Sequence, residues 1–349
     1  MNISPEPMLL NPPVTVAVIN FNGASTLHPT IESILKQDYP EIAEIRLVDN
    51  HSTDTSLELV RSAFGERVRI VSLPDNRGPN PARNQALKNS GTPLVIVMDN
   101  DIILAPDYVR KLAAAFALHP EAGAVSGQIR LHEQPDVIQY NGAFIHYAGE
   151  VVANRTDSDE PVRVGVVPTG ALMVSREHAA AVGFLDEEFI FGWADGDFTH
   201  RLALAGFPCY VVSRAVCLHM QKSRGMKWVR YQIRNRWWFI LKYYHGRTLL
   251  LALPGIILYQ SCAAFFFIFK GQGLAVLRGN LDVFSSLGPV WRKRRAIAKI
   301  RKLDDRQLLS GGLIEFPRQA QKTKLARILA RSVNAALSCY WMLIRRWIK

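Results

Sequence analysis

The sequence has few cysteines, and none of them is spaced for metal or redox chemistry. The four, Cys209, Cys217, Cys262 and Cys339, include no C-x-x-C motif. Neither a zinc site nor a disulfide framework is therefore expected. Residues 1–13 lack the basic and apolar segments of a signal peptide, so we expect the first part of the chain to stay in the cytoplasm.

Acidic residues are scarce in the last third of the chain. Residues 226–349 contain 24 Lys and Arg against 4 Asp and Glu, a net charge of +20, whereas residues 1–225 contain 18 and 26, a net charge of −8. The basic part also holds long apolar runs and most of the tryptophans, which nucleic-acid-binding tails usually lack. We therefore expect it to bind an anionic membrane surface and no nucleic acid.

Short apolar runs alternate with amphipathic helical patterns in the first part of the chain. This alternation predicts an α/β fold, with a mostly parallel Rossmann-like sheet flanked by helices. The expected strands are 14–19, 45–48, 68–73 and 94–98, and the expected helices are 25–37, one that ends at 64, and 82–89.

The 94–98 strand ends in two carboxylates, Asp99 and Asp101, that are separated by one residue. In open α/β sheets ligands bind at the carboxyl ends of the strands. Oxygen ligands on a short turn suit Mg²⁺ or Mn²⁺, which can hold a diphosphate. An isolated D-x-D is more often an ordinary turn, so this interpretation depends on the surrounding motifs.

Two other strands also end in loops rich in Asp and Asn, and these loops are expected to meet the D-x-D at one edge of the sheet. They supply Asn22 after the first strand, and Asp49, Asn50 and Asp54 after the second. Asp and Asn commonly form turns, but three such loops after successive strands indicate a polar crevice. Arg83, in the first turn of a helix, could face an anion there.

These motifs, in this order, resemble glycosyltransferase family 2, whose members have the GT-A fold and use nucleotide sugars. The resemblance covers residues 14–225. It is carried by V-x-V-x-V-x-N-x-N-G at 14–23, V-D-N-x-S-x-D at 48–54, N-x-G-x-x-x-A-R-N at 76–84, the D-x-D at 99–101, T-G-A-L-M-V at 169–174, G-F-L-D-E-x-F at 183–189 and A-D-x-D-x-x-x-R-L at 194–202.

The resemblance implies a role for each donor-side residue. Asp49 would contact the nucleobase, Asp99 the ribose or the metal shell, and Asp101 the divalent cation, while Arg83 would lie near the diphosphate. His219, which follows the last strand of this part, would be a further cation ligand. The full donor-binding set is Asn22, Asp49, Asn50, Asp54, Arg83 and Asp99, and the metal set is Asp101, Asp99 and His219.

On the acceptor side, the resemblance implies that Asp195 is the general base, at the start of a helix expected over 198–205. Asp197 would be structural, although both acids could simply complement the helix dipole. Thr169 and Gly170 would line the acceptor site, and an exposed Trp193 would lie against a sugar face. The family usually has Glu-Asp where this chain has Ala194-Asp195. Lys222 and Arg224 could close over the diphosphate.

The rear segment, 226–349, is expected to be mostly helical and membrane-associated. Residues 249–269 carry no charge, but Pro254 should interrupt them. Both flanks are basic, so we expect a re-entrant or interfacial helix pair, 249–269 and 272–290, in preference to a single span. The alternative is a buried packing arm or a dimer interface. Residues 324–349 form an amphipathic pattern suited to an in-plane anchor.

Together these features predict a metal-dependent glycosyltransferase of bacterial type at the cytoplasmic face of the inner membrane, and the resemblance implies that it inverts the anomeric configuration. Its substrates would be a nucleotide-diphosphate sugar and a lipid-linked or growing glycan acceptor. Related sequences with such a tail often handle deoxyhexoses such as rhamnose. The alternatives are a metal-dependent nucleotidyltransferase and a non-catalytic membrane-associated scaffold, and the oligomeric state, including a homo-oligomer, is left open.

Overall fold

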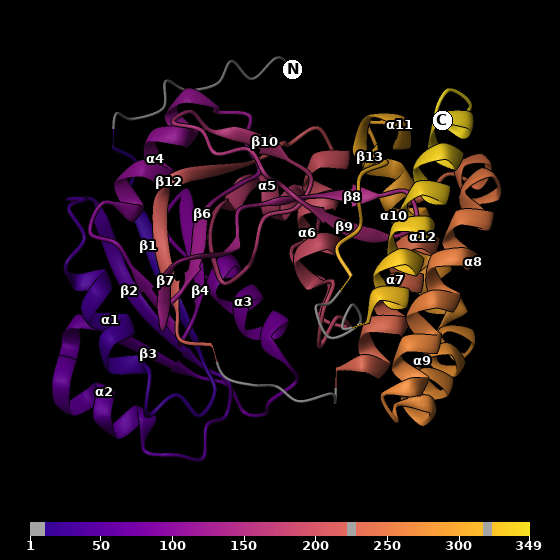
Figure 1. Ribbon diagram of the computed structural model, residues 1–349. Helices are drawn as coiled ribbons and strands as arrows, with labels where there is room; N and C mark the ends of the chain where they lie inside the picture. Colours follow the sequence, from indigo (N-terminus) through magenta and orange to yellow (C-terminus); the bar gives the residue numbers. More distant parts are fainter. Residues whose placement is uncertain (1–10, 222–227, 317–322) are drawn as a thin grey trace.

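The computed structural model describes residues 11–221, 228–316 and 323–349 (Figure 1). Within these ranges, one side of the molecule is a large twisted sheet with helices packed on it, and the other is a group of helices from the rear of the chain. The large sheet has ten strands, and its main path runs β10-β12-β6-β11-β4-β1-β2-β3. Sheet and helices together confirm the α/β class with a helical C-terminal segment.

The first half of the large sheet is parallel. Strand β1 pairs with β2 on one side and with β4 on the other, and β2 pairs with β3. Helices connect these strands, as in the expected βαβ units. The elements are β1 (Val14–Asn20), α1 (Leu27–Leu35), β2 (Ile42–Asp49), α2 (Ser56–Phe64), the short 3-10 helix Gly65–Arg67, β3 (Arg69–Ser72), α3 (Pro79–Lys88) and β4 (Leu94–Asp99).

The second half of the sheet mixes directions. Strand β11 runs antiparallel between β4 and β6, and β12 continues the sheet parallel to β6. The elements are β5 (Ile102–Leu104), α4 (Tyr108–Leu118), β6 (Ala124–Leu131), β7 (Gln134–Tyr140), β10 (Val162–Val164), β11 (Ala171–Ser175), α5 (Arg176–Ala181), α6 (Ala194–Leu204) and β12 (Cys209–His219). Strand β12 runs unbroken from Cys209 to His219, with an irregular register against β6 between Val212 and Val216.

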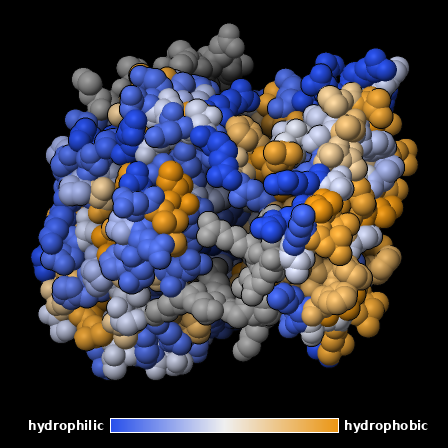
Figure 2. Space-filling view, in the orientation of Figure 1, coloured by the Kyte–Doolittle hydropathy of each residue, from blue (hydrophilic) through white to orange (hydrophobic). Residues whose placement is uncertain are grey.

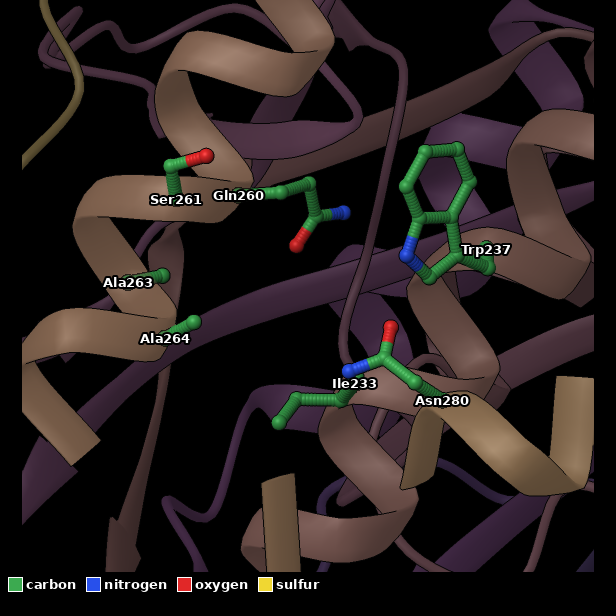
Figure 3. A pocket seen from close by; sticks show the side chains of 7 residues that line it. All are labelled: Ile233, Trp237, Gln260, Ser261, Ala263, Ala264 and Asn280. Carbon is green, nitrogen blue, oxygen red and sulfur yellow. The ribbon is translucent and has the colours of Figure 1, made fainter. Parts of the chain in front are cut away.

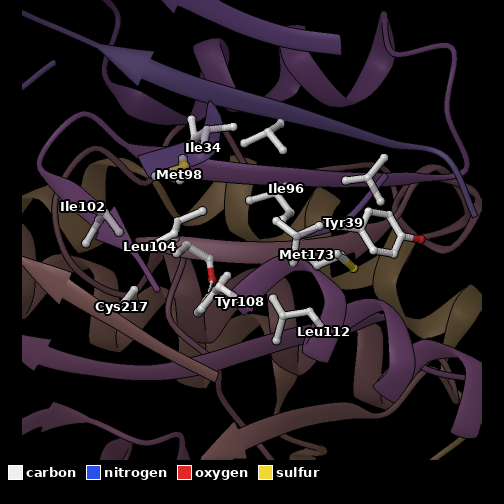
Figure 4. Packing of buried hydrophobic residues seen from close by; sticks show 14 of the residues in the cluster. Ile34, Tyr39, Ile96, Met98, Ile102, Leu104, Tyr108, Leu112, Met173 and Cys217 are labelled. Atoms are coloured by element: carbon white, nitrogen blue, oxygen red, sulfur yellow. Dashed lines mark hydrogen bonds between the residues drawn. The ribbon is translucent and has the colours of Figure 1, made fainter. Parts of the chain in front are cut away.

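The large sheet is buried on both faces, which explains its nearly uninterrupted apolar strands. Side chains alternate between the two faces along each strand. Val16 and Val18 therefore join one core, with α1 and α4, while Ala17 and Ile19 join the other, with α3 and α6. Figure 4 shows the first core around Tyr108, whose hydroxyl donates to the Ala171 carbonyl.

The rear helices share a third core with the acceptor part of the chain. The elements are β8 (Ala143–His146), β9 (Glu150–Ala153), α7 (Val229–Tyr243), α8 (Gly246–Phe269), α9 (Gly273–Ser285), α10 (Leu287–Ile300), α11 (Asp305–Leu308), β13 (Leu309–Ser310) and α12 (Lys324–Ile344). Strand β13 pairs with β8, and Phe189 and Trp193 pack among side chains of α7 and α8. The domain boundary at 225/226 remains a prediction, but one apolar core extends across it.

The interruption expected at Pro254 does not occur. Helix α8 is 24 residues long and continues through Pro254 without a break. A proline leaves the carbonyl four residues earlier without its helical partner. Packing holds the helix on both sides of this point: the Tyr340 hydroxyl donates to the neighbouring Leu251 carbonyl at 2.8 Å, and Gly255 lies against the Tyr147 ring. At a mean rise of about 1.5 Å per residue the helix is about 36 Å long.

The expected second helix, 272–290, is also divided differently. It breaks at Ser286 into α9 and α10, and the Ser286 hydroxyl accepts from the Trp238 indole at 2.7 Å. Helices α8 and α9 are joined by a turn at 270–272 and form a hairpin. Of the anchor stripe expected in α12, Leu337 and Ile344 are buried against the protein, whereas Leu325 and Trp347 remain exposed.

A cavity of about 180 Å³ lies between α7, α8 and α9 (Figure 3). Trp237, Gln260 and Asn280 reach into it from these three helices. Its lining contains no carboxylate, so it is distinct from the polar edge of the large sheet where the sequence motifs converge.

Candidate active site

The parallel strands β1, β2 and β4 bring their carboxyl ends to one edge of the sheet. The register places Asn20 beside Asp49, and Ile19 beside Asp99. The two acids lie at the ends of strands on either side of β1. The expected meeting of the Asp- and Asn-rich loops is therefore present.

Asp49 is almost completely buried and is held by three donors. Its oxygens accept from the Asn20 side-chain amide at 2.8 Å, the Ser52 hydroxyl at 2.6 Å and the Ser52 backbone N–H at 3.1 Å. Hydrogen bonds to the ionised form offset the cost of burying a carboxylate. Asp49 is thus fixed at the strand end before any ligand arrives.

Asn22, Asn50 and Asp54, the other donor-side residues of the loops after β1 and β2, form hydrogen bonds to neighbouring segments. The Asn22 side chain accepts from the Thr53 N–H at 2.8 Å, and Asp54 accepts from the Ala24 N–H at 2.9 Å. The Asn50 amide reaches Asn76, in the loop before α3, at 2.9 Å. Burial would raise the pKa of Asp54, but hydrogen bonds from Ser56 and Ala24 lower it below its ordinary value.

Arg83 and Asp99 form an ion pair, with Nη2 and Oδ1 2.6 Å apart. The Arg83 side chain is only 6% exposed and that of Asp99 28%, so the pair is largely shielded from solvent. Desolvation raises the pKa of Asp99, Arg83 opposes this rise, and the charges of Asp101 and Asp195 reinforce it. Asp101 and Asp195 are therefore both close enough to act on Asp99.

Asp101 faces His219, whose Nε2 lies 3.4 Å from Asp101 Oδ2. The other ring nitrogen of His219 lies 2.8 Å from the Gln139 side-chain oxygen, which fixes the direction of the imidazole. Within the described residues, the buried Asp101 Oδ1 has no hydrogen-bond partner. The same part of the chain contains no cluster of three His, Cys, Asp or Glu residues that could hold a metal by itself.

Asp195 lies in the first turn of α6, which begins earlier than expected because Trp193 adopts a left-handed backbone with φ of 61°. The Thr169 hydroxyl donates to Asp195 Oδ1 at 2.5 Å. Gly170, the next residue, accepts the Asp99 N–H through its carbonyl at 2.9 Å. One short segment before β11 thus contacts both the donor-side and the acceptor-side carboxylate.

Trp193 is not the exposed indole that we expected. It is 8% exposed, and its ring packs on Phe239 with centroids 4.6 Å apart. The left-handed turn directs the side chain inwards, toward helix α7, so a sugar face cannot lie on it as expected. Phe191, two residues before Trp193, is exposed instead.

Two residues at the site were missed by the sequence analysis. Tyr140, at the end of β7, lies close enough to Asp195 that the carboxylate adds to the rise in pKa that burial gives the phenol. Asn20 is completely buried between Asp49 and the D-x-D loop. The sequence signal for Asn20 was its place as the first residue of the N-x-N-G motif. Lys222 and Arg224 lie outside the described residues.

The sequence matches two profiles of known families. The profile named Glycosyl transferase family 2 matches residues 15–171, and that named Glycosyl transferase family group 2 matches residues 94–292, more than half of the chain. The chain belongs to glycosyltransferase family 2. The D-x-D lies within both matched regions, and Asp195 within the second.

Curated relatives of this family member include proteins of bacterial glycan synthesis. The succinoglycan biosynthesis protein ExoO of Rhizobium meliloti is 32% identical over 139 residues, which are 40% of this chain and 38% of the relative. The poly-beta-1,6-N-acetyl-D-glucosamine synthase of Staphylococcus epidermidis is 27% identical over 219 residues, 62% of this chain and 52% of the relative. The matches thus span about half or less of these relatives.

Solved structures confirm the GT-A fold. GalNAc-T7, solved with UDP, GalNAc and Mn²⁺, superposes with a TM-score of 0.61 at 15% identity, covering 80% of this chain and 57% of that one. The mannosyltransferase PcManGT of Pyrobaculum calidifontis, solved with GDP-Man and Mn²⁺, gives 0.53 at 18% identity and covers 99% and 90%. At these identities the likeness concerns the fold alone.

Proposed function

We propose that this protein transfers a sugar from a nucleotide-diphosphate sugar to an acceptor hydroxyl with inversion, and that Asp195 is the general base. The observation that carries this proposal is the contact between Thr169 and Asp195, 2.5 Å long, beside the donor-side acids. Thr169 occupies Oδ1, so Oδ2 is the oxygen that takes the acceptor proton. The deprotonated oxygen attacks the anomeric carbon as the bond to the diphosphate breaks.

The donor would bind along the edge formed by β1, β2 and β4. Asp49, held by Asn20 and Ser52, would accept from the nucleobase, while Asn22, Asn50 and Asp54 keep the surrounding loops in place. Arg83 would lie next to the phosphates, and it balances the negative charge of Asp99. Its Nε has no partner among the described residues, so a phosphate oxygen could accept from it.

Asp101 and His219 fit a divalent cation. The unpartnered Oδ1 of Asp101 and the His219 Nε2 that faces the same carboxylate are an oxygen and a nitrogen of the types that Mn²⁺ accepts. Two protein ligands suffice when substrate phosphates and water complete the shell, as is common for Mg²⁺ sites. When bound, the cation would neutralise charge on the leaving diphosphate. Solved neighbours contain Mn²⁺, which supports this cofactor.

On the acceptor side Thr169 donates to Asp195, Tyr140 lies close to the same carboxylate, and Gly170 follows Thr169 in the chain. A retaining mechanism by double displacement would require a second nucleophile on the opposite face of the sugar. Asp99, one of the neighbouring carboxylates, is already engaged by Arg83. A single displacement by the acceptor is therefore the simpler reaction at this site, and it inverts the anomeric configuration.

We further propose that the acceptor is lipid-linked or a growing polysaccharide, and that the rear helices bind the cytoplasmic face of the membrane. Figure 2 shows apolar side chains gathered over the rear helices at one side of the molecule. The exposed ones include Leu250, Phe265, Ile268, Phe269, Leu274, Leu277, Leu281, Phe284, Leu325, Ile328 and Trp347. A contiguous apolar surface in a segment of charge +20 fits an anionic bilayer.

The arrangement of α8 favours peripheral attachment over a crossing. Among the described residues α8 is the helix that is long and apolar enough to span a bilayer. Its inner face, however, packs on the catalytic part through Gly255 on Tyr147, and through Tyr259, whose hydroxyl donates to Glu150 at 2.8 Å. We therefore propose that the α8–α9 hairpin lies on the membrane and inserts its tip, near Phe269, into the bilayer interface.

A donor screen tests the enzymatic part of this proposal. Purified protein would be incubated with UDP-, dTDP- and GDP-sugars, with Mn²⁺ or Mg²⁺ and with membrane lipid extracts as the acceptor source. We expect release of one nucleoside diphosphate that depends on the extract and is lost in Asp101→Asn. Release of pyrophosphate would support a nucleotidyltransferase instead, and no turnover with any donor would contradict the proposal.

A further inference from the structure

Asn20 connects the two acidic loops of the donor edge. Its side chain is completely buried at the end of β1. The amide nitrogen donates to Asp49 Oδ1 at 2.8 Å and lies 3.0 Å from both the Ser52 and the Ser56 hydroxyl. The amide oxygen accepts from the Asn100 side chain at 2.7 Å. The acceptors around the nitrogen fix this orientation of the amide.

Asn100 is the central residue of the D-x-D loop, and this loop is held from several sides. The Asn100 carbonyl accepts from the Thr30 hydroxyl at 3.1 Å, and the Asp101 carbonyl accepts from the Met220 N–H at 2.8 Å. The backbone of the loop is thus attached to α1 and to the residue after β12. Its connection to the Asp49 loop is the side-chain bond between Asn100 and Asn20.

Gly23 provides the space in which this connection is made. A Cβ at position 23 would lie 2.3 Å from Asn100 Nδ2 and 2.3 Å from Asn20 Oδ1. Real atoms do not approach so closely, so any larger residue would push the two amides apart. The backbone φ of Gly23 does not require glycine, and the reason for glycine here is therefore this close approach.

We infer that Asn20 is a positioning residue that couples recognition of the nucleobase to binding of the divalent cation. The inference rests on the proposed function, in which Asp49 meets the base and Asp101 the cation. A base bound to Asp49 would fix the Asn20 amide, which in turn would fix Asn100 and the loop that carries Asp101. A correct nucleoside then raises the affinity of the cation site, although it has no phosphate with which to touch the cation.

The experiment measures Mn²⁺ affinity from the electron paramagnetic resonance signal of free Mn²⁺. The full chain is titrated alone and in the presence of saturating uridine, thymidine or guanosine, whichever corresponds to the diphosphate that the protein binds. Nucleosides without phosphates are used so that coupling must pass through the protein. In the wild type we expect the nucleoside to raise Mn²⁺ affinity at least about fivefold, the lower end of typical coupling between sites.

The variants separate this connection from general damage to the site. Asn20→Ala and Asn100→Ala should each reduce the coupling to less than about twofold, and the double variant should lose no more than either single one, because all three break the same connection. Ser56→Ala is the matched control: it removes one buried partner of Asn20 but keeps the bonds to Asp49 and Asn100, so the coupling should persist.

Each outcome decides the inference. If Asn20→Ala does not fold, the more exposed Asn100→Ala and the crowded Gly23→Ala give the same test. Undiminished coupling in those variants, or no coupling in a wild type that binds both Mn²⁺ and the nucleoside, would overturn the inference and leave the proposed function intact. A wild type that binds neither Mn²⁺ nor any nucleoside diphosphate would contradict the proposed function and this inference with it.

Discussion

Lys242 of α7 and Asp197 of α6 form an ion pair whose two side chains are 2% and 1% exposed. Asp197 also accepts from the Tyr243 hydroxyl at 2.9 Å and from Arg201 at 3.0 Å, and Lys242 also binds Asp186 at 2.7 Å. Asp195 lies two residues before Asp197 on the same helix. The rear helices therefore hold α6, the helix that carries the proposed base. The buried partners of Asp197 indicate that its role is to stabilise this contact between helices.

Breaking this pair should destabilise the protein and reduce turnover. In Lys242→Met the carboxylate of Asp197 stays buried without its closest cation, and loss of one partner of a buried ion pair typically costs about 3–5 kcal/mol. Urea unfolding should show a loss of this size. Nucleoside diphosphate binding should survive at low temperature, because Asp49 and Asp101 belong to other elements.

The control for that variant is Lys293→Met. Lys293 also binds Asp186, at 2.6 Å, but its side chain is 31% exposed. A partly exposed pair contributes about 1 kcal/mol or less. Equal losses of stability in the two variants would contradict the special role given to Lys242.

A divalent cation should be required for turnover. EDTA should abolish activity, and added Mn²⁺ or Mg²⁺ should restore it, because Asp101 and the diphosphate would otherwise repel each other. The control is EDTA that has been saturated with Mg²⁺ before addition. Full activity in excess free chelator would exclude the metal role of Asp101 and His219.

Attachment to membranes should depend on the tip of the α8–α9 hairpin. Phe269 and Leu274 are 76% and 59% exposed. Burying a large apolar side chain contributes about 1.5–3 kcal/mol, so Phe269→Glu with Leu274→Glu should weaken binding to anionic vesicles at least about tenfold in a flotation assay. High salt alone should not release the wild type, whereas detergent should.

The matched control carries the same change at a distant exposed position. Leu118, at the end of α4, is 64% exposed and lies on the catalytic part of the molecule. Leu118→Glu should bind vesicles as the wild type does. If it weakened binding as much as the hairpin variant, the hairpin would not be the membrane contact.

Two buried histidines should make the protein less stable in mild acid. Burial lowers the pKa of His146 to about 4 and that of His200 to about 3. Unfolded histidines titrate near 6.5, so between about pH 6.5 and 4 the unfolded chain binds protons that the folded chain refuses. Stability is therefore fully present above pH 6.5 and falls as the pH decreases.

The size of the effect can be measured in a single variant. In His146→Asn an amide oxygen can still accept from the Ala148 N–H, which now donates to the imidazole Nδ1 at 3.0 Å. The His146 contribution is on the order of 3 kcal/mol across this range. Urea unfolding at pH 7 and pH 4.5 should show a smaller difference in the variant, and equal differences would contradict the assignment.

Much of the donor edge could be predicted from the sequence, because a strand followed by Asp and Asn is a local pattern. Asp49, Asp99 and Asp101 were found in this way. The burial of Trp193 could not, since it depends on one left-handed residue and on Phe239, 46 positions later in the chain. The packing of α8 around Pro254 likewise involves Tyr340 and Tyr147, which no local pattern connects to it.

The contact of Thr169 with Asp195 was similarly hidden, because each residue lay in a separate motif of the family. Sequence placed both on the acceptor side without bringing them together. The Asn20 to Asn100 connection spans 80 positions and uses residues that also suit ordinary turns. Such long-range side-chain contacts decide how the site works, and they required the fold.

The central claim is that Asp195 is the general base, and one comparison tests it most directly. Asp195→Asn and Asp197→Asn would be assayed side by side, with nucleoside diphosphate binding measured by calorimetry and turnover by product release. Asp195→Asn should bind as the wild type does while turnover falls at least about 10²-fold. Asp197→Asn should lose stability and keep measurable turnover. An active Asp195→Asn beside a folded but inactive Asp197→Asn would contradict the account.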